Sequence, residues 1–275
     1  MLAALLITFR EGLEAALIVG ITLGALRRLG RRDRGISVWA GAIAAIAVSV
    51  LAALALNAVG VALEGRGEQV FEGATMLLAC GVLTWMVLWL QRQGGRTQTD
   101  LEEHTRRALL EDSPRMLFGV AFVAVLREGI ETALFLTAAS LSVAAGQTLL
   151  GGALGLLAAL AVGWLIYAGG KRLDVRAFFR VTGVLLILFA AGLLAHGVHE
   201  LQEAGLLPVV IEHVWDISPI LSDEGTLGSL LKALLGYNAN PSLLEVVAYV
   251  GYLVAALVAW RRSSRARLAA GPVGG

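Results

Sequence analysis

Residues 6–20 read LITFREGLEAALIVG, and residues 122–136 read FVAVLREGIETALFL. Both stretches are strongly apolar, yet each carries an Arg-Glu-Gly-x-Glu motif near its centre. A charge without a partner is costly in an apolar environment. The charged residues of the two copies are Arg10, Glu11, Glu14, Arg127, Glu128 and Glu131. Any fold proposed for this chain must place these six charges where they are paired or bind a ligand.

The composition indicates a membrane protein. The chain has 275 residues, of which 57% are hydrophobic, a larger share than in a typical soluble domain. A bilayer-spanning helix needs roughly 20 mostly apolar residues. Runs of this kind lie at about 1–26, 36–62, 70–90, 116–144, 149–170, 177–200 and 242–260. Because these runs are continuous and do not alternate, we predict an all-α integral membrane protein with seven transmembrane helices in the lipid bilayer.

The N-terminal run lacks a basic leader and a small-residue cleavage site, so we expect it to be retained as the first span. The single cysteine, Cys80, lies in an apolar run and excludes a disulfide framework. We expect it to be a small buried hydrophobic residue.

Basic residues are distributed unevenly between the connections. Outside the two motifs, Lys and Arg are concentrated around 27–34, 91–115, 171–180 and 261–267, whereas the alternate connections hold only Arg66 and Lys232. The positive-inside rule therefore predicts a multi-pass protein of the cytoplasmic (inner) membrane with its N-terminus outside and its C-terminus in the cytoplasm. The opposite face is acidic, which either concentrates cations at the surface or only reflects the absence of Lys and Arg there.

The motif also identifies an internal repeat. REGLEAAL (10–17) and REGIETAL (127–134) agree at six of eight positions, and each copy is followed by two further spans. Units of three spans enter the membrane in opposite directions, so we predict two inverted-topology three-helix repeats plus a seventh helix. The expected single transmembrane domain consists of repeat one 1–90, cytoplasmic linker 91–115, repeat two 116–200, periplasmic segment 201–241, last helix 242–260 and cytoplasmic tail 261–275.

The motif acids are candidates for a cation site. On a helix, residues three and four apart share a face, so the two glutamates of each copy are neighbours and the arginine can pair with the second. One arginine per copy leaves one carboxylate without a counter-charge, and carboxylate oxygens suit hard cations. We predict metal binding by Glu11, Glu14, Glu128 and Glu131, with Arg10 and Arg127 as supporting charges. The alternative is that each Arg–Glu pair is purely structural.

Paired motifs in the first and fourth spans resemble those of the oxidase-dependent iron transporter family, which includes fungal high-affinity iron permeases and bacterial Efe-type permeases. The stretch AAGLLAHGVHELQEAG (190–205) is similar to the bacterial branch. The resemblance implies iron as the transported substrate, motif glutamates that bind it, and a periplasmic or extracellular iron-delivery or oxidase protein as a partner. The chain lacks the long N-terminal extension of some relatives, so such a partner would be a separate protein.

Further residues are candidates for the pathway. His196, His199 and Glu200 are expected on one face near the outer end of the sixth span, and Glu72 lies just inside the third. Each of these also fits a polar residue at the membrane interface, the interpretation favoured for Glu245. Residues 226–241 predict a short amphipathic helix at the membrane surface, and residues 99–114 predict a cytoplasmic helix.

The sequence thus predicts a permease that imports iron, as Fe3+ or as Fe2+ oxidised outside, through a midplane glutamate cluster. Transport of another divalent cation, such as lead or manganese, and a non-transporting scaffold are the alternatives. A membrane metalloenzyme is disfavoured because catalytic motifs are lacking. We expect no organic cofactor and no nucleic-acid partner. The oligomeric state cannot be predicted.

Overall fold

The computed structural model describes residues 1–93, 113–142, 145–169, 175–223 and 225–269. Within them the chain is helical and contains no strand. The long helices are α1 (Leu2–Arg28), α2 (Gly35–Ala62), α3 (Arg66–Gln93), α5 (Pro114–Ser142), α6 (Ala145–Gly169), α7 (Val175–Glu203) and α9 (Leu243–Ala269). Two short elements accompany them, the 3-10 helix η1 (Arg32–Arg34) and α8 (Thr226–Leu235). The cytoplasmic helix expected within 99–114 lies almost entirely outside the described residues.

Each apolar run expected to span the membrane coincides with one of the long helices. In the described part of the chain, five helices are long and apolar enough to cross a bilayer: α2, α3, α6, α7 and α9. Helices α1 and α5 have 27 and 29 residues, but each carries the three charges of its motif. Composition therefore separates these two helices from the others, and their length does not.

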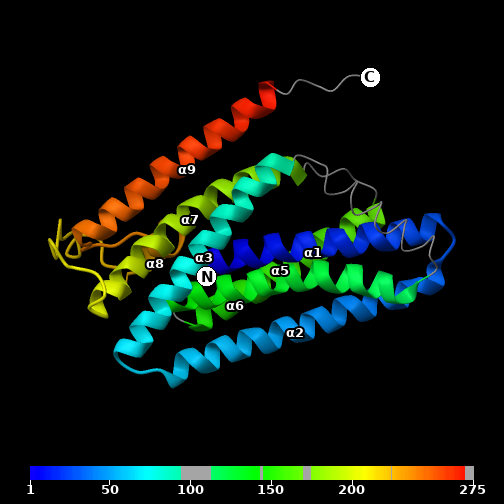
Figure 1. Cartoon of the computed structure of the whole chain (residues 1–275), viewed down its shortest axis with the longest axis horizontal. Helices are drawn as coiled ribbons and strands as arrows, with labels where there is room; N and C mark the ends of the chain where they lie inside the picture. Colours follow the sequence, from blue (N-terminus) through cyan, green and yellow to red (C-terminus); the bar gives the residue numbers. More distant parts are fainter. Residues whose placement is uncertain (94–112, 143–144, 170–174, 224, 270–275) are drawn as a thin grey trace.

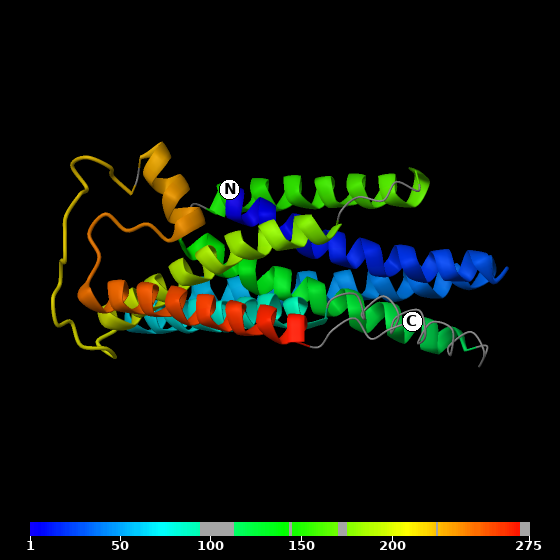
Figure 2. The ribbon, with the colours of Figure 1, turned by 90° about the horizontal axis from the view of Figure 1, so that it is seen from above.

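The helices pack in pairs that join the two halves of the chain. The most extensive contacts are α1 with α6, α2 with α5, and α3 with α7, and α1 also contacts α5. Figure 1 and Figure 2 show α1 and α5 side by side and running in opposite directions. Helix α9 packs against α7 and α3. The two motif helices are thus central neighbours in the bundle.

Large apolar side chains on the peripheral helices face outward. Examples on α2, α6 and α9 are Ile43, Leu51, Leu157, Leu160 and Val250, all of them exposed. An apolar surface of this extent is unusual for a soluble protein and suits contact with lipid tails. The long apolar helices and this exposed apolar surface indicate a multi-pass membrane protein.

Glycines set the close approach of α1 and α6. A Cβ atom at Gly155 would collide with the carbonyl oxygen of Leu5 and would lie 2.9 Å from the nitrogen of Phe9. Small residues allow membrane helices to approach closely and to gain van der Waals contact, because lipid offers no hydrophobic driving force between helices. The same packing is not found at Gly20 and Gly24, where no described atom lies within 4 Å of a Cβ position.

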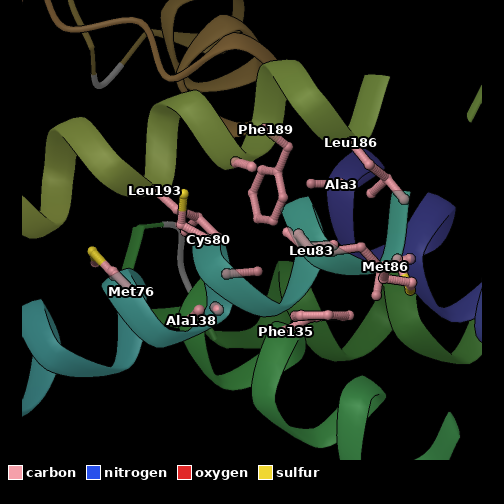
Figure 3. Packing of buried hydrophobic residues seen from close by; sticks show 14 of the residues in the cluster. Ala3, Met76, Cys80, Leu83, Met86, Phe135, Ala138, Leu186, Phe189 and Leu193 are labelled. Atoms are coloured by element: carbon pink, nitrogen blue, oxygen red, sulfur yellow. The ribbon is translucent and has the colours of Figure 1, made fainter. Parts of the chain in front are cut away.

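The apolar core lies between α1, α3, α5 and α7 (Figure 3). Its largest side chains include Phe135, Leu83 and Met86, which are almost fully buried. Cys80 is part of this cluster and is a free, buried cysteine, as expected. This core joins the two motif helices to the third helix of each half.

Helix α8 closes the segment between α7 and α9. It ends at Gly236, whose positive φ of 67° is the left-handed conformation common after helices. The Cα atom of Gly192 on α7 lies so close that a Cβ at Gly236 would collide with it. The amphipathic helix expected in this region is therefore present, and its C-terminal end packs on α7.

Candidate metal site

Arg10 anchors the α1 half of the site. It is only 1% exposed, and its Nη1 donates a hydrogen bond of 2.7 Å to Oε1 of Glu11. Its Nη2 forms an ion pair of 2.9 Å with Oε1 of Glu14, one helical turn away. Nη1 also donates to the sulfur of Met86 on α3 at 2.8 Å. The arginine therefore contacts both motif acids, whereas the sequence predicted pairing with Glu14 in particular.

Arg127 plays the corresponding part in α5, with more exposure. Its Nε donates to Oε1 of Glu131 at 2.9 Å and lies 3.7 Å from Oε1 of Glu128. Its side chain is 36% exposed, and the guanidinium carbon lies 5.1 Å from the ring centroid of Trp89 on α3. A cation over an indole ring at this distance is attracted by the electron-rich face. Each arginine thus contacts the two glutamates of its own motif, but the surroundings of the two arginines differ.

Three motif carboxylates converge between α1 and α5. Glu11, Glu128 and Glu131 each offer an oxygen, and these three oxygens lie within 4.8 Å of one another. All three side chains are buried, with exposures of 0%, 3% and 7%. The Oε2 atom of each has no hydrogen-bond partner among the described residues. Glu14 lies outside this group and is held by Arg10.

The glycine of each motif allows a neighbouring helix to pack closely against the motif helix, and this packing helps to position the acids. A Cβ atom at Gly12 would lie 3.0 Å from that of Ala159 on α6, and one at Gly129 would collide with Ser49 on α2. The glycine side of each motif therefore packs against a neighbouring helix, while the carboxylates turn toward the other motif.

This arrangement suits a cation. Like charges at such short range in a low dielectric repel strongly, so the ionised cluster needs protons or a metal ion. Carboxylate oxygens bind hard cations and also coordinate iron. The three glutamates come from two helices, α1 and α5. Two arginines reduce the repulsion but contact only one oxygen of each acid in the group.

The outer end of the bundle holds a separate polar network. His199 contacts Oε1 of Glu245 through Nδ1 at 3.0 Å and Oε1 of Glu203 through Nε2 at 3.2 Å. Glu245 is 2% exposed and also accepts hydrogen bonds from Asn238 and from the backbone nitrogen of Ser242. Glu245 therefore caps the start of α9 from inside the protein, and its position at the membrane interface stays a prediction.

The remaining pathway candidates do not join the glutamate group. His196 is buried and its Nδ1 lies 3.0 Å from the carbonyl oxygen of Gly192. Glu72 and Glu200 are partly buried, on α3 and α7 respectively. In the described residues, a set of acidic, histidine or cysteine ligands close enough to share one ion is found only at Glu11, Glu128 and Glu131.

Comparison with known proteins identifies the family. The profile described as the Iron permease FTR1 family matches residues 1–262, which include both motifs and α9 up to Arg262. The chain belongs to this family. The resemblance inferred from the motifs is thereby confirmed, and FTR1 membership indicates a transporter of iron in preference to an enzyme.

Curated FTR1 relatives cover nearly the whole chain. The ferrous iron permease EfeU of Shigella sonnei is 36% identical over 269 residues, 97% of each chain. EfeU of Escherichia coli O157:H7 has the same identity and coverage. EfeU of Yersinia pestis is 34% identical over 260 residues, 94% of this chain and 92% of its own. No solved structure matches this chain.

Two residues of this candidate site were not predicted from the sequence. Met86 and Trp89 lie in an apolar stretch of α3, and each contacts one of the motif arginines. Met86 looks like any core side chain in the sequence, and a tryptophan near a helix end is usual at a membrane interface. Only the packing of α3 against both motif helices reveals them.

Proposed function

We propose that this protein imports iron across the cytoplasmic membrane and that Glu11, Glu128 and Glu131 bind the ion midway. The convergence of these three buried carboxylates within 4.8 Å is the observation that carries the proposal. Family membership supports iron as the cargo, and the relatives are named ferrous iron permeases. Glu14 and the two arginines would hold the charge balance when the ion is absent.

We infer that the two halves are inverted repeats about this site. Gly12 of α1 contacts α6, the second helix of the other half, and Gly129 of α5 likewise contacts α2. The two contacts are therefore equivalent when the halves are exchanged. Further along, Gly151 on α6 approaches the Met1 carbonyl, while Gly41 on α2 approaches the Phe118 carbonyl. Each second contact lies 11 residues from the motif glycine along the motif helix and 8 residues along its partner.

The third pair of helices supports the same exchange. Gly73 of α3 faces Gly197 of α7, and Val87 of α3 faces Gly183 of α7. The two α3 positions are 14 residues apart, as are the two α7 positions. Inverted repeats place the substrate site at their interface near the midplane, where the two motifs lie.

Direction and delivery follow from the same proposal. The basic connections would lie in the cytoplasm, so iron would enter from the end that holds His199, Glu200 and Glu72. A separate oxidase or delivery protein at that end is implied by the resemblance. Import as Fe3+ remains a prediction, and the names of the relatives instead favour Fe2+.

Iron uptake by reconstituted vesicles tests the proposal. We expect Glu131→Gln to lower the rate of iron entry by at least about tenfold, because it removes a charged ligand from the buried group. Glu64→Gln is the matched control, since Glu64 is exposed in the α2–α3 connection. Wild-type rates in a well-folded Glu131→Gln protein would overturn the proposal. Absence of flux in the wild type would instead favour the scaffold.

Cation competition separates iron from the alternative cargoes. Carboxylates distinguish cations mainly by size and charge, so manganese or lead could enter the same group. We expect iron to compete best in a series measured at equal concentrations. Stronger competition by manganese or lead would identify that ion as the transported cation, bound at the same carboxylate group.

A further inference from the structure

Met86 brings a sulfur atom to the edge of the glutamate site. Its side chain is 1% exposed, and its Sδ accepts a hydrogen bond of 2.8 Å from Nη1 of Arg10. The same Nη1 donates to Glu11 at 2.7 Å, so the sulfur lies within about 5.5 Å of that carboxylate oxygen. Figure 3 shows Met86 on α3 beside α1, away from Met76 at the other side of the core.

The guanidinium of Arg10 marks a place where a cation is stable. Three acceptors from two helices meet it: oxygens of Glu11 and Glu14, and the sulfur of Met86. Groups that stabilise a buried guanidinium with their lone pairs are also able to coordinate a metal ion of the same sign. Glu11 belongs to this set and to the three-carboxylate group, so the two positions adjoin.

We propose that Met86 is a ligand of the transported ion and makes the site selective for Fe2+. In this step the ion occupies the position held by the Arg10 guanidinium, bound by Glu11, Glu14 and Met86. The proposal rests on the proposed iron transport and adds the chemical basis of its selectivity. No bond of the protein forms or breaks other than coordination to the metal.

Donor chemistry gives the direction of the selectivity. A thioether is a soft, polarisable donor, whereas Mg2+, Ca2+ and Mn2+ prefer oxygen ligands. Fe3+ is harder than Fe2+ and gains less from sulfur. Carboxylates alone would accept all of these ions, so the sulfur adds a preference for Fe2+ that the glutamates do not supply.

The second half of the molecule places another such donor at the equivalent position. Exchanging the halves turns the contact of Gly73 with Gly197 into the contact of Gly183 with Val87, so Val87 corresponds to Gly197. Met86, one residue earlier, then corresponds to His196, and both side chains are buried. Because Nδ1 of His196 faces the Gly192 carbonyl, this nitrogen carries the hydrogen and Nε2 retains its lone pair in the neutral ring. His196 nevertheless lies outside the glutamate group, so among these two residues only Met86 reaches a motif residue.

Arg127 illustrates where Arg10 can move when the ion binds. Arg127 keeps its ion pair with the second motif glutamate but is partly exposed and lies over the Trp89 ring. By analogy, Arg10 leaves Met86 and keeps its ion pair with Glu14.

X-ray absorption at the iron edge tests the sulfur ligand. The purified full-length protein is loaded with Fe2+ without oxygen, and the nearest atoms around iron are determined for the wild type and for Met86→Leu. We expect a sulfur neighbour in the wild type that is lost in Met86→Leu. Met76→Leu is the matched control, because it removes another buried thioether from α3 and should keep the signal. No sulfur in the wild type, or sulfur that persists in Met86→Leu, would overturn the proposal.

Vesicle uptake distinguishes this proposal from the one on which it rests. We expect Met86→Leu to lower the ratio of Fe2+ to Mn2+ entry by about tenfold, with Mn2+ entry retained. An unchanged ratio overturns the role of Met86 even if Glu131→Gln abolishes uptake. Wild-type uptake by Glu131→Gln, with the sulfur signal present, instead overturns the three-carboxylate site.

Discussion

Arg10 shows how a full charge is tolerated in the middle of an apolar helix. Its guanidinium donates hydrogen bonds to Glu11 and Met86 and forms an ion pair with Glu14, and these contacts offset the cost of removing it from water. Breaking such a set by removing one partner leaves an uncompensated charge. The positive charge of Arg10 therefore belongs to the charge balance of the site.

The ring of Trp89 should hold Arg127 in place. A cation–π contact contributes about 0.5–1 kcal/mol at a partly exposed position, equivalent to a factor of about 2–5. We expect Trp89→Leu to raise the iron concentration needed for half-maximal uptake by about that factor, whereas Trp89→Phe keeps most of the contact. Equal half-saturation in Trp89→Leu and the wild type would show that the ring does not support the site.

At the residue scale, the sequence predicts the acids but not their grouping. The spacing of the motif indicates that Glu11 and Glu14 share a face, yet the group of three takes Glu11 and leaves Glu14 with Arg10. The choice depends on the rotation of α1 against α5, which Gly12 and Ala159 set through α6. Such tertiary packing leaves no local signal in the sequence.

At the level of elements, hydrophobicity predicts the long helices well because each run fills the thickness of a bilayer. Helices α1 and α5 are not among the five helices that meet a strict limit on charged residues, because each carries the three charges of its motif. Gly20 and Gly24 have the same four-residue spacing as Gly151 and Gly155, but no described atom lies within 4 Å of their Cβ positions. Spacing of small residues does not tell which face of a helix meets a neighbour.

The closeness of α1 and α6 should depend on Gly155. A methyl group there would meet backbone atoms of Leu5 and Phe9, which cannot move without separating the helices. We expect Gly155→Ala to destabilise the protein by about 1–3 kcal/mol, measured as a lower melting temperature in detergent. Gly24→Ala is the control, because its Cβ position is open and alanine favours the helix. Equal melting temperatures for the two variants would contradict this account of the packing.

For the whole molecule, the proposed exchange of two halves would explain why the site lies between α1 and α5. Each motif helix packs on the second helix of the other half, so the two motifs come together only in the assembled bundle. Figure 1 shows α1 and α5 running in opposite directions, which agrees with the proposed units of three spans. The motif repetition predicts this relation, whereas the positions of α8 and the capping of α9 have no counterpart in the repeat.

The orientation in the membrane is the last property that this architecture predicts. The α1–α2 and α2–α3 connections lie at opposite ends of the bundle (Figure 1), and we expect the first in the cytoplasm because of its arginines. The variants Asp33→Cys and Glu64→Cys each replace an exposed acid in one connection, and Cys80 is buried and adds little background. A thiol reagent that cannot cross membranes should label Glu64→Cys in intact spheroplasts and Asp33→Cys only after lysis. The reverse labelling pattern would show the opposite orientation in the membrane, with the basic connections outside and iron entering from that end.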